Sequence, residues 1–218
     1  DALKNLNFTK QEAMIFVSLS KEGTLTGYEA AKLSGISRSN AYATLQSLVD
    51  KGYAYAIDGN PVRYKAITKD DLINNSRRDF EKNIELIESE LTNAKTDDNP
   101  FITIEKEVNV LNKIENLLQK VSTRLYFSAN SSVISQFAEP LSQLAQSGIK
   151  VVILSEKQVL NGHTIFYQSN TKETIKLIID TQEILVGTLA QALNTQNDTL
   201  VKIIREAMVN EIELIKRH

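Results

Sequence analysis

The sequence predicts an α+β multidomain chain with a small N-terminal domain, a central helix and a larger C-terminal α/β domain. Three observations support this. Helical segments precede a period-two hairpin within residues 1–68, and an apolar seam at spacings of three and four occupies residues 69–95. After the polar, proline-terminated stretch 95–100, short apolar runs alternate with helical ones. We therefore expect three parts, residues 1–68, 69–95 and 101–218.

Composition limits the chemistry that the chain can perform. Its 218 residues include no cysteine and two histidines, and its formal net charge is −2. Disulfides and a thiol nucleophile are excluded, and the histidines are not spaced as metal ligands. There is no apolar run long enough to span a bilayer and no basic-then-apolar leader. We expect a cytoplasmic protein without a cofactor, a metal or a membrane partner.

The N-terminal segment contains three helix signals in succession. Capping boxes at residues 9–12 and 26–29 open two helices, the second of which stops at Gly35. Ser37 is the expected N-cap of a third helix, which ends near Gly52. The apolar positions of this third helix should face a core: Ala41, Leu45 and Leu48.

A hairpin follows directly, with period-two runs at 53–57 and 62–67 around the turn 58–61. Helix, short helix, tight turn, helix and hairpin is the order of a winged helix-turn-helix. Residues 1–68 carry eight basic and six acidic side chains, so this domain is mildly basic although the chain is acidic. We therefore expect double-stranded DNA as the partner.

The helix after Ser37 has a small, polar face that suits the edges of base pairs. An ordinary amphipathic helix is the alternative, but the neighbouring segments favour recognition of DNA. We expect Ser39, Asn40, Gln46 and Ser47 to approach bases, and Arg38, Tyr42, Arg63 and Lys65 to contact phosphate or sugar.

Residues 69–95 resemble a coiled-coil helix, which should run to about residue 94. Its apolar positions alternate at spacings of three and four if Arg77 takes one core position, and the other face is heavily charged. A single helix packed on its own domain is the alternative; the narrow seam favours a homodimer. The expected dimer residues are Ile73, Phe80, Ile84, Ile87 and Leu91.

The C-terminal segment begins as βαβαβ, which predicts a largely parallel sheet. Strands are expected at 101–105, 124–129, 150–154, 164–167, 175–179 and 183–187, and helices at 107–122, 132–147 and 198–216. Pro140 should kink or restart the helix that contains it.

Together these segments resemble the TrmB family of prokaryotic transcriptional regulators. The resemblance rests on residues 30–42 with Leu45, Leu48 and Lys51-Gly52, on the ending Arg63-Tyr64-Lys65-Ala66-Ile67, and on residues 177–180 and 183–188 ahead of the last helix. It implies a dimeric DNA-binding regulator whose C-terminal domain resembles half of a phospholipase D domain. Family members are associated with sugar sensing; larger members have a further sugar-binding domain, before which this chain ends.

A small effector is expected at the carboxyl edge of the C-terminal sheet, where open α/β sheets bind ligands. Amides at a helix start with nearby hydroxyls suit an anion, a sugar phosphate or a polyol. The expected effector residues are Asn130, Ser131, Ser132 and Ser155, joined by Asp180 if the second hairpin folds over the same edge. The alternative is that the first three only cap their helix and that Asp180 only makes its turn.

The resemblance to phospholipase D also suggests that the chain could hydrolyse phosphodiesters. That chemistry needs a histidine nucleophile, a lysine two residues after the histidine and an aspartate five residues after the lysine. With Asp180 as the aspartate, Ile175 and Glu173 occupy the other positions; with Lys176 as the lysine, Thr174 and Thr181 do. We therefore expect no enzyme. Three interpretations remain: a metabolite-responsive regulator, a constitutive or architectural DNA binder whose C-terminal domain serves assembly, and a remnant phosphodiesterase.

Overall fold

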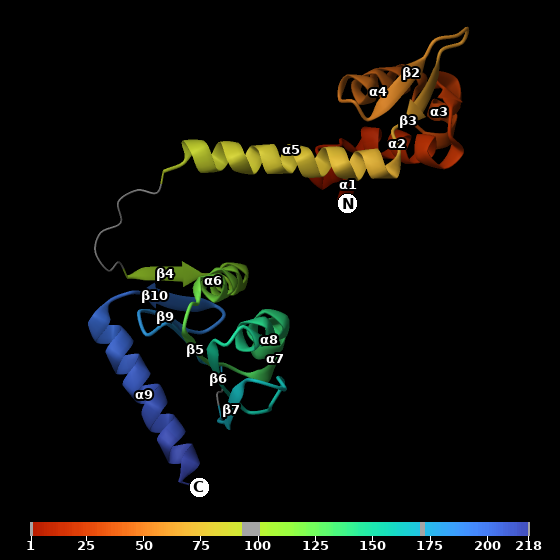
Figure 1. Ribbon diagram of the computed structural model, residues 1–218. Coiled ribbons are helices and arrows are strands. Elements are labelled where there is room, and N and C mark those ends of the chain that lie inside the picture. Colours follow the sequence, from red (N-terminus) through yellow and green to blue (C-terminus); the bar gives the residue numbers. More distant parts are fainter. Residues whose placement is uncertain (1, 93–100, 171–172, 218) are drawn as a thin grey trace. The chain divides into compact units, whose positions relative to one another are not determined.

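The computed structural model describes residues 2–92, 101–170 and 173–217, so the predicted linker at 95–100 lies outside the described residues. The chain divides into two compact units, Asp1–Asn93 and Ala94–His218 (Figure 1). Each unit has its own hydrophobic core.

The N-terminal unit is a winged helix-turn-helix followed by a long helix. Its helices are α1 (Ala2–Asn5), α2 (Lys10–Glu22), α3 (Gly27–Ser34), α4 (Arg38–Asp50) and α5 (Lys69–Glu90). A three-stranded antiparallel sheet has the order β1 (Leu25–Thr26), β3 (Arg63–Ala66), β2 (Ala54–Ile57). The β2–β3 hairpin is the wing that the period-two runs predict.

The helix caps agree with the sequence at two of three positions. Thr9 with Glu12 and Thr26 with Glu29 form complete capping boxes. Ser37 precedes α4 as predicted, but its side chain makes no capping hydrogen bond, so that part of the prediction is wrong. The α3–α4 turn depends instead on Gly35, whose φ of 70° lies in the left-handed region.

Helix α5 is shorter than predicted, because it ends at Glu90 rather than near residue 94. Leu91 is its C-cap and has an extended backbone. Leu72 is the residue of α5 that is buried, and it joins the winged-helix core, so the helix is attached to its unit at its first turn.

The C-terminal unit contains a seven-stranded mixed sheet. Its order is β4 (Ile102–Glu105), β10 (Gln191–Thr195), β9 (Glu183–Gly187), β8 (Ile175–Ile179), β5 (Arg124–Ser128), β6 (Lys150–Ser155) and β7 (Ile165–Gln168). The β5–β6 and β6–β7 pairs are parallel and the other four are antiparallel.

The prediction of a largely parallel sheet is therefore wrong. It placed the first strand beside β5, but β4 pairs with β10 at the far edge. Two successive hairpins, β8–β9 and β9–β10, insert three strands between β4 and β5. Strand β10 was not predicted from the sequence. Its ends, Gln191 and Thr195, are polar, so the segment lacks the apolar pattern of a strand although Ala192 and Asn194 are buried.

Helices cover both faces of this sheet. One core joins α6 (Glu107–Lys120), α7 (Ser131–Gln136) and α8 (Ala138–Gln146) to the sheet, and α9 (Asp198–Lys216) contributes to a separate cluster with β6, β8 and β9. The predicted restart near Pro140 is confirmed. The break lies at Phe137, and Pro140 falls in the first turn of α8, where its missing N–H costs no hydrogen bond.

Candidate nucleic-acid interface

The predicted recognition helix α4 is fixed by its apolar face. Ala41, Leu45 and Leu48 are fully buried, as the sequence predicts, and Thr44 is a further buried position. These side chains join residues of α2 and α3 in one cluster. The opposite face of α4 is exposed.

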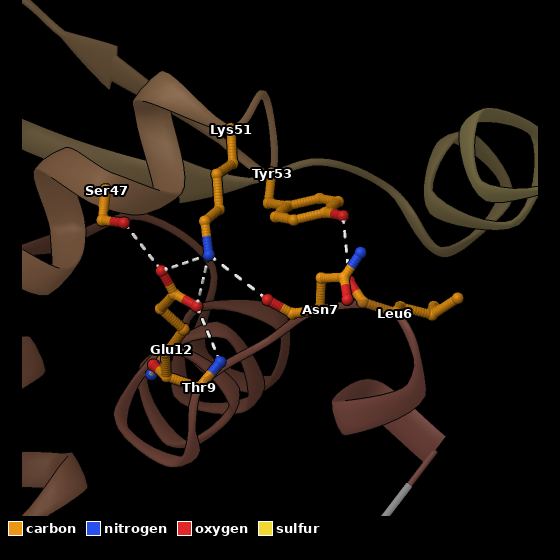
Figure 2. A network of polar contacts seen from close by, with 7 residues as sticks. All are labelled: Leu6, Asn7, Thr9, Glu12, Ser47, Lys51 and Tyr53. Carbon is orange, nitrogen blue, oxygen red and sulfur yellow. Dashed lines mark hydrogen bonds and ion pairs between the residues drawn. The ribbon is translucent and has the colours of Figure 1, made fainter. Parts of the chain in front are cut away.

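A buried carboxylate holds the C-terminal end of α4 against α2 (Figure 2). Glu12 is only 3% exposed. Its Oε1 accepts from Ser47 Oγ at 2.7 Å and lies 2.8 Å from Lys51 Nζ, while its Oε2 accepts from the Thr9 amide at 2.7 Å. Lys51 also donates to the Asn7 carbonyl at 3.2 Å. The capping carboxylate of α2 is thereby the anchor of α4.

The pKa of Glu12 shows how strongly these donors act. Burial alone raises the pKa of a carboxyl group, because it removes water from the charged form. Hydrogen bonds from Lys51, Ser47 and the Thr9 amide outweigh that effect and lower the pKa to about 2 from 4.5. Glu12 is therefore charged in the folded protein at neutral pH.

This network corrects the placement of Ser47. The sequence put Ser47 on the DNA-facing side, but its hydroxyl is half-buried and donates to Glu12 on α2. At helical spacing Ser47 lies between the buried and the exposed faces, and no sequence pattern of α4 alone reveals a carboxylate 35 residues away.

The start of α4 presents polar side chains to solvent. Ser39, Asn40 and Gln46 are exposed, as predicted for base-reading residues. Gln46 Nε2 donates to Asp50 Oδ1 at 2.8 Å one turn further along the same face. The Gln46 carbonyl oxygen makes no hydrogen bond to another described residue, so it can accept a further hydrogen bond.

Two aromatic residues pack around the start of α3. The Arg38 guanidinium lies 4.3 Å from the centroid of the Tyr28 ring, a cation–π contact that orients an exposed cation. The Tyr42 ring lies so close to Gly27 that a Cβ there would come within 2.3 Å of it. Tyr28 was not singled out from the sequence; its exposed position beside the capping box at Thr26 was the available signal.

The wing carries its cations on one side. Arg63 and Lys65 are exposed and alternate with buried Tyr64 and Ala66, as the period-two pattern predicts. Arg63 Nη2 donates to the Thr24 carbonyl at 3.3 Å, which holds the side chain near the start of β1.

Two further exposed side chains share this side of the wing. Tyr55 stands opposite Lys65 and Ile57 opposite Arg63 in the β2–β3 register. Sequence reasoning overlooked both, although the alternation in residues 53–57 contained the signal.

The predicted dimer residues form an uncovered apolar stripe on α5. The exposed fractions of Ile73, Phe80, Ile84, Ile87 and Leu91 run from 39% at Ile84 to 72% at Leu91. Because these side chains do not pack on their own unit, the alternative of a helix buried in its own domain does not hold for them.

The four predicted effector residues at the carboxyl edge of β5 and β6 do come together, but around a carboxylate of the protein itself. Glu156 accepts from the Ser131 amide at 2.9 Å and from Ser155 Oγ at 3.0 Å. Asn130 Oδ1 caps α7 and accepts from Ser132 Oγ. Ser155 is fully buried, so it holds Glu156 in place and faces no ligand.

The hydrogen bonds at this edge stabilise the charged form of the Glu156 carboxylate. Donation by the Ser131 side chain and then the Ser131 amide lowers the pKa of Glu156 to about 2. The start of α7, which the sequence assigned to an anionic ligand, is thus already in contact with a negative charge.

The placement of Asp180 with these residues is wrong. Because β8 runs antiparallel to β5, Asp180 follows Ile179 at the end of the sheet where β5 begins. Its carboxylate accepts from the amides of Ser122, Thr123 and Arg124 at 2.8 to 2.9 Å. Burial raises the pKa of Asp180, but these amides, Arg124 foremost, lower it well below the usual range. Asp180 fixes a turn at the opposite edge.

Other kinds of site are absent from the described part of the chain. Over residues 2–92, 101–170 and 173–217, no three His, Cys, Asp or Glu side chains gather as a metal site. Within the same residues, no helix combines the length and apolarity that a bilayer crossing requires.

Comparison with known sequences agrees with the winged helix-turn-helix fold of the N-terminal unit. Residues 3–70 match the family described as sugar-specific transcriptional regulator TrmB. The expected resemblance to this family is confirmed for that part of the chain.

The chain is similar in sequence to one bacterial and one archaeal protein. The chain is 26% identical over 243 residues to the uncharacterized protein YrhO of Bacillus subtilis, covering 100% of this chain and 86% of that protein. It is 29% identical over 83 residues to the HTH-type sugar sensing transcriptional regulator TrmBL1 of Pyrococcus furiosus. That match covers 38% of this chain and 24% of TrmBL1.

Two solved structures are also similar. TrmBL2, described as an archaeal chromatin protein with a novel mode of DNA binding, has a TM-score of 0.47 and 17% identity over 94% of this chain and 93% of that chain. NucT from Helicobacter pylori has a TM-score of 0.43 and 14% identity, and the match covers 53% of this chain and 95% of NucT.

The Glu12 network predicts a pH-dependent stability of the N-terminal unit. Since the folded pKa of Glu12 is about 2 against 4.5 for the free group, its contribution is complete above pH 4.5 and is lost as pH falls toward 2. Glu12→Gln should lower the free energy of unfolding by about 3 kcal/mol at pH 7, and by progressively less as the pH is lowered.

Urea unfolding followed by tyrosine fluorescence measures this, because five of the seven tyrosines lie in residues 1–68. Glu22→Gln on the exposed end of α2 is the matched control and should have the stability of the wild type. An equal loss in both variants, or a loss in Glu12→Gln that is constant with pH, would contradict this role of Glu12.

Proposed function

We propose that this protein is a sequence-specific, dimeric DNA-binding transcriptional regulator. The observation that carries the proposal is the exposed polar face of α4 beside a wing whose cations lie on one side, in a segment that matches a family of transcriptional regulators. A major groove admits such a helix, and the wing cations suit the adjacent phosphates.

The proposed DNA-binding residues divide by their chemistry into those that contact bases and those that contact the DNA backbone. Ser39, Asn40 and Gln46 have hydroxyl or amide groups that suit base edges, and they are proposed to read sequence. Arg38, Tyr42, Arg63 and Lys65 are proposed to contact the backbone, which fixes register without reading sequence.

Dimerisation is proposed through the apolar stripe of α5. Each apolar side chain moved from water into an interface contributes about 1.5–3 kcal/mol when it is fully buried. The stripe is narrow and is flanked by charged residues, which is the pattern of a helix that pairs with another helix. A two-fold dimer would present two recognition helices to a palindromic site.

The C-terminal unit is proposed to be a half phospholipase D-like domain with a regulatory role. A response to a sugar or sugar phosphate is the proposal that follows from the family match. The edge around Glu156 argues against an anionic ligand there, because a carboxylate already takes the Ser131 amide. A neutral polyol is therefore the better candidate, with exposed Ser132 and half-buried Asn130 to receive it.

A constitutive or architectural DNA binder is the second candidate, and one observation favours it. The polar groups at the carboxyl edge of the sheet bond to one another: Glu211 on α9 pairs with Lys176 at 3.1 Å and accepts from Ser169. An edge whose polar groups are already satisfied has less to gain from a ligand. Calorimetry with polyols and sugar phosphates, on wild type and Asn130→Ala, separates the two candidates.

Hydrolysis is the least favoured interpretation. Lys176 and Asp180 lie at opposite ends of β8, and each is occupied: Lys176 by Glu211, Asp180 by three backbone amides. No residue in the matching positions supplies a histidine.

The DNA assignment predicts different effects for two substitutions. Arg63→Ala should weaken binding to all sequences alike and reduce the salt slope by about 1, since one phosphate contact is lost. Gln46→Ala should cost about 1–3 kcal/mol on the preferred sequence only, because one base contact is lost. Anisotropy titrations of operator and scrambled DNA at several salt concentrations measure both.

Glu22→Gln is the control for both substitutions. It should keep the sequence preference, because Glu22 lies at the exposed end of α2, outside α4, the wing and the Glu12 network. Unchanged operator affinity in both Gln46→Ala and Arg63→Ala would overturn the assignment.

The dimer proposal predicts that Ile84→Lys or Ile87→Lys yields monomers that bind operator DNA poorly, because the pairing would bury like charges. Light scattering at micromolar concentration measures the oligomeric state. Leu86→Lys is the matched control: Leu86 is 56% exposed, lies off the seam, and should leave the dimer intact. A dimer that survives both seam substitutions would move the interface to another surface.

A further inference from the structure

The apolar stripe of α5 is interrupted by one cation. Arg77 takes the core position between Ile73 and Phe80, one turn from each. It is exposed and, among the described residues, makes neither a hydrogen bond nor an ion pair. Whatever covers the stripe must therefore accommodate a positive charge.

The positive charge of Arg77 is unfavourable in a parallel, in-register pair of α5 helices. That arrangement sets each seam residue against its own copy, so that Arg77 meets Arg77 inside the interface. Two like charges in a partly desolvated layer repel each other, and neither finds a counter-ion in that layer.

The charges of α5 are also divided along its length. Residues 69–78 carry three basic and two acidic side chains, and residues 79–90 carry one basic and five acidic side chains. A parallel pair aligns the two acidic halves. An antiparallel pair sets each acidic half beside the half that contains Arg77 and Arg78, and it also opposes the two helix dipoles favourably.

One antiparallel register matches the seam positions within α5. It pairs Phe80 with Ile84 and Arg77 with Ile87 of a second copy, and each pair occurs twice about a midpoint at Lys82. Ile73 then lies opposite the end of the second helix, where Leu91 is the C-cap. Core positions of the two types that alternate in a heptad face each other in this register, as an antiparallel coil requires.

The same register gives Arg77 its counter-ions. Glu88 and Glu90 follow Ile87 by one and three residues, and at helical spacing they lie on the two sides of the seam. Both are exposed and unpaired among the described residues. The aliphatic stem of Arg77 covers Ile87 of the second copy while its guanidinium reaches these carboxylates at the rim.

We propose that α5 pairs with a second copy of itself in an antiparallel coil, with Arg77 facing Ile87 and with the two-fold axis at Lys82. The proposal rests on the proposed dimer and specifies its direction and register. The partner is thus another molecule of this chain, held by charge complementarity as well as by the apolar stripe.

The antiparallel direction has a consequence for DNA. Leu72 attaches the winged helix to α5 and lies ten residues from the two-fold axis at Lys82. At about 1.5 Å per residue, the two attachment points are therefore about 30 Å apart along the coil, close to the ~34 Å of one DNA turn. This spacing fits two half-sites on successive turns of the major groove.

Cysteine cross-linking decides the direction, because the chain has no cysteine of its own. Full-length Arg77→Cys and Ile87→Cys variants, carrying tags of different mass, are oxidised separately and as a mixture after subunit exchange. The mixture should shift to a covalent heterodimer, and each variant alone should remain at monomer mass. In an antiparallel coil, two copies of residue 77 lie about 15 Å apart along the axis, beyond the reach of a disulfide.

The outcomes are distinct. Covalent homodimers of Arg77→Cys and of Ile87→Cys would show a parallel coil and overturn the inference, while the proposed dimer would stand. No cross-link in protein that light scattering shows to be dimeric would overturn the register. No cross-link in monomeric protein would overturn both the inference and the proposed dimer.

Lys82→Cys is the matched control for random collision. Lys82 is at the midpoint of the coil but on its outer face, so it should give no covalent dimer in either direction. Cross-linking of Lys82→Cys as fast as the mixed pair would show that collision, rather than the proposed register, brings the thiols together.

Discussion

The buried charge of Glu12 is the interaction on which the candidate DNA-binding surface depends. It caps its own helix at Thr9 and receives Ser47 and Lys51 from the end of α4, so one carboxylate sets the angle between two helices. A buried anion left without these donors would destabilise the unit, which makes the arrangement specific. These contacts fix the end of α4 on α2 and so position the exposed face that is proposed to read base edges.

The apolar stripe of α5 is the second constraint. Its side chains are uncovered within their own unit, and Arg77 interrupts them beside a strongly acidic half-helix. In the proposed pair of helices, the second copy covers the apolar surface, and the antiparallel direction places Arg77 near carboxylates. The spacing of two winged helices on DNA would then follow from the distance along α5 between Leu72 and the axis at Lys82, with no need for the C-terminal unit to set it.

Much of the fold could be predicted from local patterns. Capping boxes, period-two strands and the spacing of apolar residues predicted α2 to α4, the wing and most C-terminal elements, because these signals arise from neighbours in the chain. Pairings between distant residues could not be predicted. The sheet order depended on β10, Ser47 depended on Glu12, and the place of Asp180 depended on the antiparallel pairing of β8 with β5. Glu156 was adjacent to the predicted effector residues, but only the fold shows that it occupies their donors.

Selection of bound sequences from a random DNA library tests the central proposal, a two-fold regulator that reads sequence through α4, most directly. A two-fold dimer should enrich an inverted repeat whose half-sites are separated by about one helical turn or a multiple of it. Bound DNA that shows no enriched sequence after repeated rounds would contradict the account and leave the architectural alternative.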